Sequence, residues 1–136
     1  MRNHSELGRP CLVAAALLLT STASAHHSFA AIFDSEKPLT LSGTVTSIDW
    51  VNPHIHFSIE VSGDDGEVNE WRFEGFPRDM LMRQGWRRGE TLKPGDTVTV
   101  TGWHARDELY LGSVRSVRFS DGRELNAGPP VSIDGR

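Results

Sequence analysis

The sequence predicts a mainly β fold, an OB-like five-stranded small barrel with one short helix between its third and fourth strands. Alternating apolar and polar residues run from Leu39 onward, turns rich in glycine, proline and aspartate separate the runs, and one helical pattern follows the third run. Three strands, a helix and two more strands are the element order of the OB fold. Another small antiparallel barrel or sandwich is the competing architecture.

The first strand is expected to bend. Apolar residues alternate with polar ones from Leu39 to Val45, and Ile48 and Trp50 then continue in the opposite phase. Such a slip predicts a β-bulge near Thr46-Ser47, where one strand serves two parts of a barrel. Asn52-Pro53 predicts a tight break after it.

The second and third strands form a predicted hairpin. The alternation of Ile55–Val61 directs its apolar residues inward, and Ser62–Gly66 form a turn. Trp71 and Phe73 continue the apolar face on the returning strand, and the register that we expect pairs Phe57 with Trp71.

A short helix is expected over Phe76–Gly85, because Pro77 suits a first helical turn and Gly85 suits a helix end. The remaining elements follow in order: a turn at 92–96, a fourth strand at 97–101, a polar loop at 105–110, a fifth strand through Val114, Val117 and Phe119, and a closing strand at 123–125 after the Asp121-Gly122 turn.

The first 25 residues predict a secretory signal peptide. Two arginines precede the apolar run Leu12–Leu19, and Ala23 and Ala25 occupy positions −3 and −1 of the cut. The run is too short for a permanent anchor, so we expect no integral membrane segment in the mature chain and a periplasmic or secreted location. The expected divisions are a cleaved signal peptide at 1–25, an N-terminal segment at 26–38, the barrel domain at 39–125 and a mobile tail at 126–136.

Composition argues against several function classes. Cleavage removes two of the 14 basic residues and one of the 18 acidic residues, which leaves a net charge of −5. This charge disfavours nucleic acid as a partner. Cys11, the only cysteine, lies in the signal peptide, so the mature chain has no disulfide and no thiol nucleophile. No nucleophile elbow, phosphate-binding glycine loop or zinc-protease motif occurs, and we expect no enzyme.

Seven short motifs occur in order along the mature chain: His26-His27-Ser28-Phe29, Phe33-Asp34, Gly43-Thr44-Val45, Asn52-Pro53-His54, Arg83-Gln84-Gly85-Trp86, Leu92-Lys93-Pro94-Gly95-Asp96 and Asp121-Gly122-Arg123. With these motifs the chain resembles a family of small exported bacterial proteins, domain of unknown function 6152. The resemblance implies an exported barrel-like domain and implies no activity. His56 departs from the family pattern, so among the histidines only His26, His27 and His54 match it.

Histidines supply the candidate metal ligands. Cleavage of the signal peptide would make His26 the first residue, whose amine and ring nitrogen form a chelate that suits copper or nickel as well as zinc. His27 follows it. His54 comes after the loop between strands one and two, and His104 precedes the loop between strands four and five. These two loops lie at one end of an OB barrel, here called the loop pole, where ligands of this fold tend to bind. If the apolar segment 29–33 packs at the loop pole, His26, His27, His54 and His104 share one cavity.

The expected hairpin register adds a carboxylate, because it places His54 opposite Glu74 and His56 opposite Arg72. Glu74 is then a metal ligand or an acceptor that orients the His54 ring, whereas Arg72 disfavours a cation near His56. The alternatives are a solvated N-terminus, a hydrogen-bonding role for His54 in its loop and surface positions for the other histidines. We expect an exported, soluble binding module, with copper or zinc as the candidate cofactor.

The tryptophans suggest a second hypothesis. Trp50 and Trp103 flank the loop pole and are expected either to cap the barrel end or to form a stacking platform. The platform would make the protein a non-metal interaction module for a peptide, glycan or protein partner. Trp86, among three arginines, is interpreted as a surface patch with cation–π stacking, or as part of a solvated face.

Overall fold

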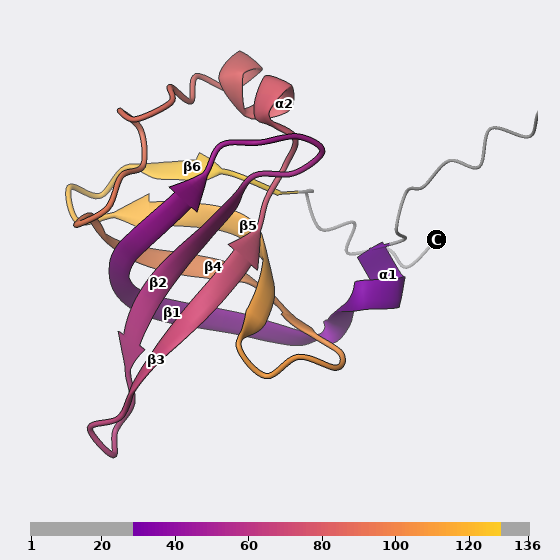
Figure 1. The fold of residues 1–136 in the computed structure, drawn as a ribbon, viewed down its shortest axis with the longest axis vertical. Coiled ribbons are helices and arrows are strands. Elements are labelled where there is room, and N and C mark those ends of the chain that lie inside the picture. Colours follow the sequence, from indigo (N-terminus) through magenta and orange to yellow (C-terminus); the bar gives the residue numbers. More distant parts are fainter. Residues whose placement is uncertain (1–28, 129–136) are drawn as a thin grey trace, which may run out of the picture.

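The computed structural model describes residues 29–128, which form a six-stranded sheet whose first five strands close into a barrel (Figure 1). The hydrogen-bonded order is β3-β2-β1-β4-β5-β6, and a parallel pairing of β3 with β5 closes the ring. This connectivity confirms the mainly β, OB-like fold class. The elements are α1 (Phe29–Ile32), β1 (Phe33–Asp49), β2 (His56–Ser62), β3 (Val68–Glu74), α2 (Arg78–Arg83), β4 (Thr97–Ala105), β5 (Leu111–Phe119) and β6 (Glu124–Asn126).

β1 bends and belongs to both sides of the barrel. Its first part pairs with β4 and its last part with β2, so one strand of 17 residues serves both sides. Its register against β2 shifts between Val45 and Ser47, which confirms the bulge predicted near Thr46-Ser47. β1 begins at Phe33 rather than at Leu39, because its first residues also pair with β4.

The β2–β3 hairpin is paired two residues away from the predicted register. Phe57 lies opposite Phe73 instead of Trp71, and the two phenyl rings stack with centroids 5.5 Å apart. The cause is the loop, since residues 63–67 separate the last paired residues of the two strands. A shift of two residues keeps every side chain on its face, so the predicted alternation was right although the predicted partners were wrong.

The segment around α2 packs onto the core. α2 is shorter than predicted, with Pro77 just before it and Gly85 after it at a φ of 94°. Leu81 from α2 and Trp86 are both fully buried. The hypothesis of an exposed Trp86 patch is therefore wrong, because the indole is inside and its Nε1 donates a hydrogen bond of 3.0 Å to the Asn126 carbonyl.

β5 contains a second bulge. Thr101 pairs with Ser116 and Gly102 pairs with Val114, so Arg115 between them has no partner on β4. The Arg115 carbonyl instead accepts hydrogen bonds of 2.9 and 3.2 Å from the two residues that follow β6. β6 itself lies one residue later than the predicted closing strand. Within residues 29–128, no helix is long and apolar enough to cross a membrane.

Candidate functional site

His54 is held in one orientation by the end of β3. It lies before β2, just after the cis Asn52-Pro53 bond, and its Nδ1 is 2.9 Å from the carbonyl oxygen of Gly75. A carbonyl oxygen only accepts hydrogen bonds, so Nδ1 carries the hydrogen and donates it. In the neutral ring Nε2 then carries the lone pair, which is the form in which histidine binds a metal ion.

Glu74 lies between two histidines. Its Oε1 is 3.8 Å from Nδ1 of His54, and its Oε2 is 3.5 Å from Nε2 of His56. The observed register causes this arrangement, because His56 rather than His54 is the residue directly opposite Glu74. The prediction that His56 faces Arg72 is therefore wrong. Arg72 forms an ion pair with Asp49, with Nη2 3.6 Å from Oδ2.

A small cavity opens beside these groups. It has a volume of about 160 Å³, and its lining includes His54 and Glu74 together with Phe29 at the start of the described chain. The Phe29 ring packs against Phe33 and, edge-on, against Trp103, with centroid distances of 5.4 and 5.5 Å. The beginning of the described chain and the histidine before β2 therefore meet at one cavity.

Arg106 fastens α1 to the barrel. Its Nε donates a hydrogen bond of 2.8 Å to the Ala30 carbonyl, and its backbone N–H donates one of 2.8 Å to the Ile32 carbonyl. Its Nη1 also lies 3.4 Å from Oδ2 of Asp34. Backbone and side-chain contacts from one loop residue thus fix the position of the chain where it enters the barrel.

The predicted cleavage residues Ala23 and Ala25 and the candidate ligands His26 and His27 lie outside the described residues. The covalent chain still limits their distance from the cavity. His27 precedes Phe29 by two residues, and an extended chain spans at most about 3.3–3.6 Å per residue, so the two Cα atoms lie within about 7 Å of each other.

The structure places His104 at a different cavity. Its ring meets the Trp71 ring edge-on with centroids 5.0 Å apart, and it lines a cavity of about 380 Å³ with charged residues of the β4–β5 loop. No group of three or more His, Cys, Asp or Glu side chains in residues 29–128 is arranged to hold a metal ion. A metal site beside His54 and Glu74 therefore needs a further donor from elsewhere.

The two tryptophans of the expected ligand pole are buried. Trp50 is 9% exposed and packs in the hydrophobic core, while Trp103 is 7% exposed and lies against Phe29. Stacking of a ligand requires an open ring face. These exposed fractions leave little ring surface for the stacking platform that the sequence suggested.

Two features near the cavities were not predicted from the sequence. The position of His56 beside Glu74 has no sequence signal, because both hairpin registers preserve the same alternation. The bulge at Arg115, in contrast, does have a signal in the sequence. Val114 and Val117 are both buried although they lie three positions apart along β5, and this odd spacing breaks the strand alternation.

Comparisons with known proteins give a family and a fold likeness. The family described as "Family of unknown function (DUF6152)" matches residues 14–114. No curated protein matches the chain. Among solved structures, the mitochondrial single-stranded DNA binding protein Rim1 of S. cerevisiae is similar, with 16% sequence identity over 68% of this chain and 96% of Rim1 and a TM-score of 0.46. DNA binding is a property of Rim1, and the expectation that this chain binds no nucleic acid stays a prediction.

Proposed function

The chain belongs to the family of unknown function DUF6152, and from that starting point we propose that it is an exported domain that binds a transition-metal ion, copper or zinc, beside His54. The proposed ligands are Nε2 of His54 and the amine and ring nitrogen of His26, with Glu74 at the same cavity. The observation that carries the proposal is the hydrogen bond from Nδ1 of His54 to the Gly75 carbonyl, which leaves Nε2 for the metal.

The surroundings of His54 support a ligand role. A histidine that binds a metal almost always donates its other ring N–H to a carbonyl or carboxylate, which fixes the ring and makes the ligand nitrogen more basic. His54 has a carbonyl oxygen 2.9 Å and a Glu74 oxygen 3.8 Å from the same Nδ1. The negative charge of Glu74 favours a cation at this cavity, either as a direct ligand or through the histidine rings.

Export would create the missing donors. Cleavage after Ala25 frees the amine of His26, and amine and imidazole together chelate copper or zinc. The short covalent distance from Phe29, which lines the cavity, supports the proposal that His26 and His27 reach His54. We propose a periplasmic or secreted location on the same grounds. The N-terminal sequence of protein recovered from periplasm or medium tests it, since any start other than His26 removes the proposed chelate.

Metal titration tests the proposed site. Copper(II) and zinc(II) are titrated into protein that begins at His26 and into the same protein with its N-terminal amine acetylated. We expect tight binding by the first and a loss of about ten-fold or more in the second, because acetylation removes the amine as a donor and leaves every side chain in place. His54→Ala is expected to weaken binding by a similar factor.

His104→Ala is the matched control. It removes an imidazole that lines a different cavity, so its metal affinity should equal that of the starting protein. Equal affinities in the acetylated protein, in His54→Ala and in the starting protein would overturn the proposed site. A loss that appears only in His104→Ala would move the metal to the β4–β5 loop and also overturn it.

A further inference from the structure

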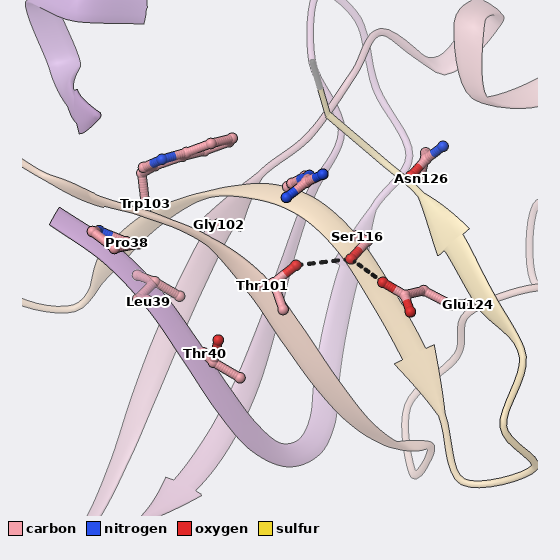
Figure 2. Close-up of a pocket in the computed structure, with 10 residues that line it drawn as sticks. Pro38, Leu39, Thr40, Thr101, Gly102, Trp103, Ser116, Glu124 and Asn126 are labelled. Carbon is pink, nitrogen blue, oxygen red and sulfur yellow. Dashed lines mark hydrogen bonds between the residues drawn. The ribbon is translucent and has the colours of Figure 1, made fainter. Parts of the chain in front are cut away.

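The sheet formed by β1, β4, β5 and β6 carries a larger cavity, which shares no lining residue with the one beside His54. Its volume is about 480 Å³, and residues from all four strands line it (Figure 2). Figure 2 shows Pro38 and Trp103 at one end and Glu124 and Asn126 at the other. The cavity thus has an apolar end and a polar end, and its volume is in the range of small-molecule sites.

Hydrogen bonds of fixed direction run along the floor of this cavity. Oγ of Ser116 donates to Oε1 of Glu124 at 2.6 Å. Because Ser116 has one hydroxyl hydrogen, its contact of 2.8 Å with Oγ1 of Thr101 must run from Thr101 to Ser116. The Thr101 oxygen is left with lone pairs that accept a hydrogen bond. The polar floor therefore offers acceptors to a ligand that carries hydroxyl groups.

The charge of Glu124 is already offset. Its Oε2 accepts hydrogen bonds from Nη2 and Nε of Arg118 at 3.0 and 3.3 Å. The hydrogen bonds from Ser116 and then from Arg118 lower the pKa of Glu124 below its ordinary value, so the carboxylate is ionised at neutral pH. It accepts hydrogen bonds without leaving an uncompensated negative charge at the polar end.

Arg115 adds a positive charge to the lining. It is the bulged residue of β5, and bulges turn a side chain in a direction that regular pairing would not allow. The Arg115 side chain is exposed and forms no ion pair within 4.0 Å in the described range 29–128, although its positive charge helps to lower the pKa of Glu124 in the same lining. A guanidinium binds a carboxylate through two parallel hydrogen bonds, so this side chain is suited to pair with an anionic group on a ligand.

We propose that this cavity binds a small hydroxylated carboxylate, the chemistry of a sugar acid. The carboxylate pairs with Arg115, and the hydroxyl groups donate hydrogen bonds to Thr101 and Glu124. The carbon skeleton of the ligand lies toward Pro38 and Trp103. This proposal does not depend on metal binding, because the two cavities share no lining residue.

Calorimetric titration of the purified protein with three probes tests the proposal. D-glucuronate has the carboxylate and the hydroxyl groups, D-glucose has the hydroxyl groups alone, and acetate has the carboxylate alone. EDTA is present throughout, so that the result is independent of the metal site. We expect glucuronate to bind about ten-fold or more tightly than either other probe, the factor that one charge-assisted hydrogen bond supplies.

Variants locate the binding. Arg115→Ala and Arg115→Gln should each weaken glucuronate binding by about ten-fold or more, while Arg123→Ala, which removes an arginine paired with Asp121, should leave it unchanged. NMR spectra of each variant establish that it is folded. Failure of glucuronate to bind, equal binding of glucose, or unchanged binding in both folded Arg115 variants would overturn the proposal.

Discussion

Replacing Trp86 with phenylalanine tests the burial of the least expected core residue. The indole is fully buried although arginines surround it in the sequence, and its Nε1 donates to the Asn126 carbonyl at 3.0 Å. Phenylalanine keeps an aromatic ring at the position. It removes the N–H donor and the second ring of the indole, so the substitution combines a lost hydrogen bond with a small cavity.

The expected loss of stability follows from these two changes. The hydrogen bond contributes a net stabilisation of about 1 kcal/mol. The volume difference of roughly 40 Å³, at about 24 cal/mol per Å³ of residual cavity, adds about 1 kcal/mol. The free energy of unfolding should therefore fall by about 2 kcal/mol. With an m-value of about 1–1.5 kcal/mol/M, the urea midpoint should fall by roughly 1.5 M.

Urea unfolding followed by far-UV circular dichroism measures this change without depending on tryptophan fluorescence. Leu109→Ala is the control, because that side chain is 72% exposed and its truncation should change the free energy of unfolding by less than about 0.5 kcal/mol. If Trp86→Phe also changes it by less than about 0.5 kcal/mol, the indole does not pack or bond as described, and the placement of the segment after α2 is wrong.

Two further predictions concern the β4–β5–β6 side of the barrel. Hydrogen bonds from Ser116 and Arg118 lower the pKa of Glu124 from its ordinary value of 4.5. The ionised carboxylate therefore stabilises the folded state at pH values above 4.5, and this stabilisation disappears as the pH falls through the lower pKa of the folded protein. Glu124→Gln removes this carboxylate. Urea unfolding should show wild type as more stable than Glu124→Gln at pH 7 and no difference near pH 2; the same difference at both pH values contradicts the assignment. Gly102→Ala places a Cβ against the Ser113 carbonyl across the β4–β5 pairing, where neither backbone can yield. We expect that variant to fold poorly or to lose more than about 3 kcal/mol, and a thermal midpoint within about 2 °C of wild type would show that the two strands are less closely paired.

Most of the fold was predicted from the alternation of apolar and polar residues along the strands. Where one face of a strand is buried, as in β2, the two-residue period assigns each side chain to a face, and the change of phase after Val45 located the first bulge correctly. The element order then led to the OB-like barrel. The alternation does not predict which residues pair across two strands, because a register shift of two residues leaves the pattern intact. The loop at residues 63–67 decided the β2–β3 register, and with it the position of His56 beside Glu74.

The burial of side chains outside the strands was also not predicted from the sequence. Trp86 follows a helix end and has no periodic apolar neighbours, so local sequence favours the surface. Its partner, the Asn126 carbonyl, is 40 residues away in the chain, and such a long-range contact has no local signal. Arg115 is the opposite case, because the spacing of Val114 and Val117 already marks the bulge that directs it.

The anchoring of α1 by Arg106 has a consequence for the strength of binding at the chain start. Donors joined by two or three residues to a fixed point reach an effective concentration of millimolar or more at a neighbouring group. At the proposed metal site the chain start and His54 would then act as one bivalent ligand, and the second contact would be intramolecular. Affinity would depend on tether length as well as on ligand identity, so glycines inserted between His27 and Phe29 would weaken binding while leaving every ligand in place.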